Sequence, residues 1–109
     1  MSNFKSLLLE HIKERASFAK SRWDAGLHTY YEGGVYGDAG KDAFKVLGQL
    51  KMHLEGHTLE TPEDAAALVQ SFIDERMQWE EDPMNVMVGT ARSLKGWIEQ
   101  MGRTLNPGA

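Results

Sequence analysis

The stretch TPEDAAALVQSFI, Thr61 to Ile73, carries the clearest helix signal in the chain. The Thr61 hydroxyl can cap a helix, Pro62 suits the first helical position, and the two acids that follow place negative charge where the helix dipole favours it. Apolar residues then recur three or four positions apart, which is the period of one helix face. We therefore expect a helix that begins here. Its inner side would carry Ala65, Leu68, Val69, Phe72, Ile73, Arg76 and Trp79.

The N-terminal segment shows the same helical period. Because Leu27 and Tyr30 continue that period, we favour one long helix that runs to about Glu32 and ends at the glycine pair 33–34. The alternative ends the helix at Gly26 and places a short β-hairpin, TYYE-GG-VY, around the glycine pair.

Two more helices are expected from capping residues and apolar period. The second helix can begin with Asp38 as its N-cap and end at Gly56. The fourth can begin at Asp82-Pro83, by the same logic as Thr61, and end at Gly102.

Gly89 and Gly96 fall inside the fourth predicted helix. Each costs about 1 kcal/mol relative to alanine in a helix interior, so their presence needs a reason. One reason is the close approach of a neighbouring backbone; the other is a kinked or frayed helix.

These elements predict an all-α fold. A chain of 109 residues has the usual size of one domain, and no stretch alternates between apolar and polar residues as a half-buried strand would. We expect a compact bundle of about four helices, with a glycine-rich loop between the first and second. Residues 1–102 would form the single domain, and residues 103–109 a flexible tail.

Composition excludes several classes of function. The chain has no cysteine, so it has no disulfide, thiolate nucleophile or cysteine-based metal site, and a cytoplasmic location fits. The N-terminal segment contains neither a signal sequence nor a membrane span. Residues 56–109 carry four basic and nine acidic side chains, and the whole chain has a net charge of -4. Nucleic acid is therefore an unlikely partner, because binding it requires a basic cluster.

The glycine-rich stretch GGVYGDAGKD, Gly33 to Asp42, invites comparison with a phosphate-binding loop. The pattern GxxxxGK[ST] requires a glycine where Val35 stands and a hydroxyl where Asp42 stands. No hydrophobic strand precedes the stretch either. We interpret it as a connection between two helices.

The stretch HLEGH, His53 to His57, is a candidate metal site. Two histidines four residues apart on one helix face can bind a metal, with Glu60 or His11 as a third ligand. Gly56, however, would end the helix and break that shared face. The competing interpretation is two histidines near a helix C-terminus, where the dipole favours positive charge.

Aromatic and acidic residues indicate a surface that binds another protein. The stretch DERMQWEED, residues 74–82, places five acids around Trp79, and three tyrosines bracket the glycine-rich loop. Such residues are either a solubilising face or the rim of an interface that would favour a basic partner. Phe18, Tyr31 and Met77 also fall partly off their helical stripes. The predicted partner-binding residues are Tyr30, Tyr31, Tyr36, Met77, Trp79, Glu80 and Glu81.

These observations favour a non-enzymatic interaction module that uses no cofactor. It would be an adaptor, regulator or inhibitor of a larger assembly, analogous to accessory proteins of viruses or mobile elements, and could form a homodimer. The alternative is a small metal-binding or hydrolytic protein that uses His53, His57 and Glu60. A third hypothesis is a nucleic-acid-associated protein, whose contacts would come from the basic edge Lys13, Arg15, Lys20 and Arg22.

Overall fold

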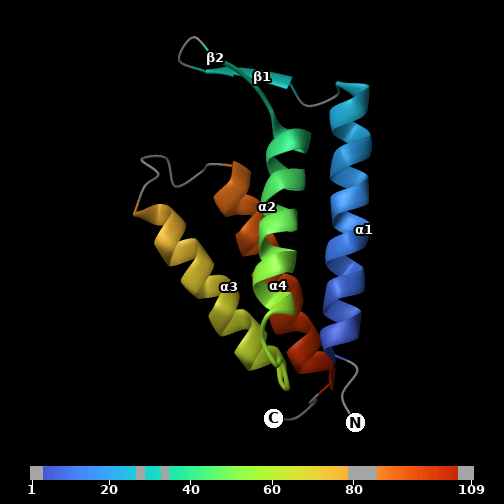
Figure 1. Ribbon diagram of the computed structural model, residues 1–109, viewed down its shortest axis with the longest axis vertical. Helices are drawn as coiled ribbons and strands as arrows, with labels where there is room; N and C mark the ends of the chain where they lie inside the picture. The colour runs from blue at the N-terminus through green and yellow to red at the C-terminus, as the bar shows by residue number, and fades with distance from the viewer. Residues whose placement is uncertain (1–3, 27–28, 33–34, 79–85, 106–109) are drawn as a thin grey trace.

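A computed structural model of the chain describes residues 4–26, 29–32, 35–78 and 86–105. The predicted bundle of four helices is confirmed, and a two-stranded antiparallel hairpin replaces the expected loop between the first and second helices (Figure 1). The elements, in chain order, are α1 (Phe4–Ala25), β1 (Thr29–Glu32), β2 (Val35–Asp38), α2 (Ala39–Glu55), α3 (Pro62–Met77) and α4 (Val86–Leu105).

The favoured extension of the first helix to about Glu32 is wrong, and the hairpin alternative is confirmed. Gly26 has a φ of 65° and its N–H donates to the Trp23 carbonyl at 3.0 Å, so the helix ends in the left-handed conformation that glycine adopts most readily. Strand-favouring tyrosines then pair across the hairpin, with Tyr31 opposite Tyr36. The apolar period that continued past Gly26 was therefore coincidental.

The predicted start of α3 is confirmed in its detail. The Thr61 hydroxyl accepts a hydrogen bond from the backbone N–H of Asp64 at 3.2 Å, and Pro62 is the first helical residue. Helix α2 ends at Glu55, directly before Gly56, also as predicted. The expected start of the fourth helix at Asp82-Pro83 lies outside the described residues.

The predicted end of the fourth helix at Gly102 is wrong, because α4 continues to Leu105. The predicted domain boundary at residue 102 therefore cuts through a helix, and residues 106–109 of the predicted tail lie outside the described part of the chain. A Cβ atom on Gly102 would lie 3.2 Å from the Pro62 Cβ, so glycine here permits close packing of α4 against the start of α3. Gly89 and Gly96 have open space around the Cβ position, so close approach does not explain them.

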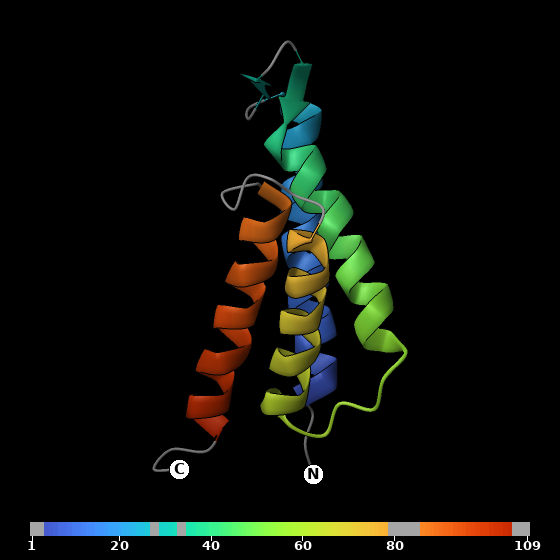
Figure 2. The ribbon, with the colours of Figure 1, turned by 90° about the vertical axis from the view of Figure 1, so that its left-hand side faces the viewer.

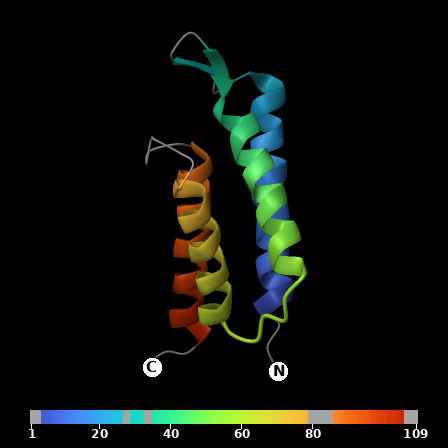
Figure 3. The same ribbon diagram turned by 60° about the vertical axis from the view of Figure 1, so that its left-hand side comes forward.

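The helices pack as two pairs, α1 with α2 and α3 with α4, and the pairs are joined mainly by α2 against α4 (Figures 1 and 2). The hairpin projects beyond the α3–α4 pair, at the end where α1 stops and α2 begins (Figure 3). One core runs between the pairs. Its buried side chains are Phe4, Leu8, Ile12, Val46, Leu47, Leu50, Leu54, Leu59, Ala65, Val69, Ile73, Val88, Ala91, Leu94 and Ile98.

Candidate functional site

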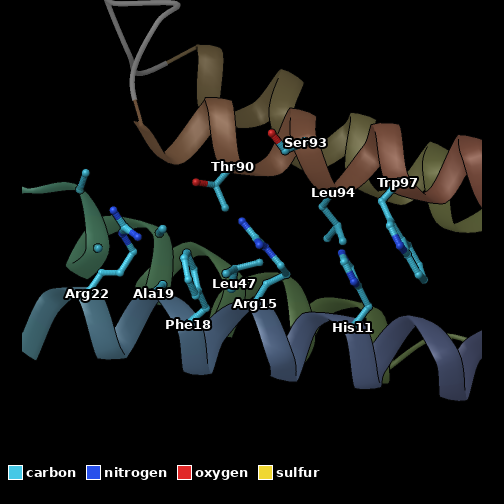
Figure 4. Close-up of a pocket in the computed structure, with 13 residues that line it drawn as sticks. His11, Arg15, Phe18, Ala19, Arg22, Leu47, Thr90, Ser93, Leu94 and Trp97 are labelled. Carbon is cyan, nitrogen blue, oxygen red and sulfur yellow. The ribbon is translucent and has the colours of Figure 1, made fainter. Parts of the chain in front are cut away.

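A groove of about 430 Å³ lies between α1, α2 and α4 (Figure 4). It exists because α1 packs on α2 while α4 packs on α3 and α2, so α1 and α4 stand on either side of α2. Small residues enlarge the space where α1 meets the start of α2: Ala19, Ala39, Gly40 and Ala43. The volume falls within the range of ligand-binding pockets in proteins.

The α1 wall of the groove is cationic and aromatic. The guanidinium carbons of Arg15 and Arg22 lie 5.2 Å and 5.1 Å from the centroid of the Phe18 ring, in the range of cation–π contacts. Phe18 itself is 48% exposed, although it is a large apolar side chain. None of the described residues that line the groove is acidic. The wall therefore carries two guanidinium groups, both close to one exposed ring.

The α4 wall contributes apolar surface and hydroxyls. Leu94 and Trp97 line the groove together with Thr90 and Ser93, and Arg15 extends from α1 toward Thr90 (Figure 4). The Thr90 hydroxyl donates to the backbone carbonyl of Val86 at 2.8 Å, so it can act toward a ligand only as an acceptor. The four α4 residues that line the groove carry no charge, so the positive charge of the lining comes from α1.

His11 and Trp97 bridge the two walls at one end of the groove. Their rings are stacked, with centroids 4.0 Å apart and planes 3° from parallel (Figure 4). Burial lowers the pKa of His11 below its usual 6.5, the positive charge of Arg15 lowers it further, and Glu14 acts in the opposite direction. His11 is therefore predominantly neutral at pH 7, and its ring stacks on the indole as a neutral imidazole.

A second cationic and aromatic cluster lies on α1 and α2 near Arg22. The Nζ atoms of Lys20 and Lys41 lie 5.3 Å and 5.8 Å from the Trp23 ring centroid. The ring centroids of Trp23 and Phe44 are 6.1 Å apart. Lys20 is also paired with Asp24 at the surface, at 2.7 Å. This cluster continues the basic and aromatic character of the groove toward the hairpin.

The residues that the sequence predicted for partner binding are only partly described. Met77 is partly buried and packs against the core, and its part in binding a partner stays a prediction. The backbone of the hairpin places Tyr31 opposite Tyr36, with Tyr30 beside them on β1. Three further predicted residues, Trp79, Glu80 and Glu81, lie outside the described part of the chain.

The predicted metal ligands do not form a group of three. The rings of His53 and His57 lie 5.3 Å apart, but His57 falls beyond the end of α2. Among residues 4–26, 39–78 and 86–104, no three histidine, aspartate or glutamate side chains are placed to hold one metal ion, and Glu60 does not complete the histidine pair. The other proposed third ligand, His11, stacks on Trp97 in the groove.

Comparison of the chain with protein-family models, with curated proteins and with solved structures found no match. Within the part of the chain that the structure describes, no helix combines the length and the apolar character that crossing a membrane would require. The site must therefore be interpreted from its own geometry.

Proposed function

We propose that this protein is a non-catalytic module that binds another protein through the groove between α1, α2 and α4. The observation that supports the proposal best is Phe18, an aromatic side chain left 48% exposed between two arginines. Aromatic residues and arginine are enriched at the centres of protein interfaces, where they contribute most of the binding energy. Burial of the ring by a partner would remove apolar surface from water.

The proposed role is that of an adaptor, regulator or inhibitor of a larger assembly, acting in the cytoplasm. The cysteine-free composition supports a reducing compartment. The hairpin tyrosines could extend the interface beyond the groove, because the hairpin projects from the end of α1 and α2 (Figure 3). A second copy of the chain is the competing partner, and the experiment below separates the two.

Capture from an extract of the native host tests this proposal with matched variants. We expect the full-length protein to retain one partner, and we expect Phe18→Asp to lose it, because the charge would lie where the partner covers the ring. Met52→Asp is the control: Met52 is 75% exposed on α2 and does not line the groove. Both variants should remain folded with a single cooperative thermal transition, since neither residue belongs to the buried core.

Two results would contradict the proposal. One is equal capture by Phe18→Asp and the unmodified protein. The other is that the protein captures no other protein but forms a concentration-dependent dimer, and that Phe18→Asp dissociates this dimer. The groove would then be an interface between two copies of the chain.

A further inference from the structure

We infer that the groove between α1, α2 and α4 is also a small-molecule site, and that it takes an aromatic carboxylic acid. The carboxylate would pair with Arg15, and the aromatic ring would pack against Phe18 and the apolar lining. Binding of the acid itself does not rest on the proposed function. The effect of the acid on the partner does, because both occupants would cover Phe18.

The groove has room for one compact molecule. Its volume of about 430 Å³ lies within the range of pockets that hold small organic ligands. The stacked rings of His11 and Trp97 meet across the groove at one end. About two turns further along α1, the lining consists of small residues, which are Ala19, Gly40 and Ala43. We therefore place the ligand in this wider part of the groove.

Arg15 supplies a positive charge that is available to a ligand. Its guanidinium carbon lies 5.2 Å from the centroid of the Phe18 ring, and no hydrogen bond or ion pair joins Arg15 to the residues that the structure describes. Figure 4 shows its side chain extending from α1 toward Thr90 inside the groove. The N–H donors of a guanidinium match the two oxygens of a carboxylate. Arg15 can therefore hold a carboxylate without first giving up another bond.

The rest of the lining favours a singly charged ligand with an aromatic body. Leu47 and Leu94 are buried and apolar, and Phe18 is 48% exposed beside Arg15. A ligand ring can meet Phe18 edge to face, and its burial removes apolar surface from water. No lysine is among the described lining residues, and Arg22 already interacts with other groups of the chain. One available guanidinium matches a carboxylate better than a doubly charged phosphate.

Titration of the full-length protein with 2-naphthoate tests the inference, and 2-naphthamide is the neutral comparison of the same shape. We expect 2-naphthoate to bind saturably and to shift the NMR signals of the backbone amides of Arg15, Thr90 and Leu94. The amide compound should bind about tenfold more weakly, because it lacks the charge that pairs with Arg15. Arg15→Gln should weaken 2-naphthoate about tenfold and leave 2-naphthamide nearly unchanged.

Lys13→Gln is the matched control, because it removes the same charge from α1 at a residue that does not line the groove. This variant should bind 2-naphthoate as the unmodified protein does, whereas Phe18→Ala should weaken both compounds. The acid site is overturned if 2-naphthoate does not bind saturably in the millimolar range or binds no better than 2-naphthamide. Equal losses in Lys13→Gln and Arg15→Gln would overturn it as well.

Capture of the partner is measured separately, so the two proposals can fail independently. Excess 2-naphthoate should reduce Phe18-dependent capture from the same extract. Capture without any binding of 2-naphthoate would leave the proposed function standing and overturn the acid site. Binding of 2-naphthoate without any captured partner would do the reverse. If 2-naphthoate binds and capture is undiminished, the acid and the partner do not share Phe18, and that part of the inference is wrong.

Discussion

The glycines of α4 differ in what surrounds them, and this difference predicts that alanine substitutions stabilise the protein to different extents. Gly89 and Gly96 are exposed with open space at the Cβ position, so Gly89→Ala and Gly96→Ala should each raise the free energy of unfolding by about 0.5–1 kcal/mol. Gly102→Ala should gain less, because its Cβ would lie 3.2 Å from the Pro62 Cβ. Urea unfolding with unchanged m-values measures all three. A larger gain at Gly102 than at Gly89 would refute the interpretation.

The environment of His11 predicts its titration. Burial and Arg15 lower the pKa of His11 below 6.5, so the unfolded chain binds a proton at this site more readily than the folded protein does. The contribution of His11 to stability is therefore complete above pH 6.5 and is lost as the pH falls from 6.5 through the lower pKa of the folded state.

NMR titration of the His11 ring measures this effect directly. Arg15→Gln should raise the pKa of His11 by removing a nearby positive charge, and Trp97→Ala should raise it by exposing the ring. Lys13→Gln is the control. This substitution removes the same charge from α1, but Lys13 is not a cause of the lowered pKa of His11. A pKa of His11 at or above 6.5 in the unmodified protein would contradict the arrangement.

At the scale of elements, the end of α1 at Gly26 and the start of α3 at Thr61 each depend on one residue. Gly26 has a φ of 65°, so Gly26→Ala should destabilise the protein by about 1–2 kcal/mol. Thr61→Ala should cost about 1 kcal/mol, since the N–H of Asp64 loses its acceptor. Thermal or urea unfolding measures both. A neutral Gly26→Ala variant would mean that α1 can continue into the hairpin segment, as the periodicity first predicted.

The same two ends explain how far the sequence predicted the elements. The start of α3 was predictable because the cap, the proline and the acids all lie within four residues of one another. The end of α1 was not, because Leu27 and Tyr30 continued the helical period while the competing hairpin required pairing between residues up to nine positions apart. The end of α4 was wrongly predicted at Gly102 for a related reason. Gly102 packs close to Pro62 of another helix, and such packing leaves no signal in the neighbouring sequence.

At the scale of the whole molecule, the groove could not be predicted from the sequence. Arg15, Phe18 and Arg22 were recognised separately, as parts of a basic edge and as an off-stripe aromatic residue. Their joint position opposite α4 depends on α1 and α4 both packing on α2 (Figures 2 and 4). The periodic spacing of two arginines around a phenylalanine was the signal available, but it gains meaning only once the facing helix is known.

Photo-crosslinking from position 18 tests the central claim, that the groove is the protein-binding surface, most directly. A photoreactive phenylalanine analogue would replace Phe18 in one variant and Met52 in another, and each would be expressed in the native host. We predict that irradiation links position 18, but not position 52, to one partner protein, and that Arg15→Glu combined with Arg22→Glu prevents the link. Equal crosslinking from both positions, or none from position 18, would contradict the claim.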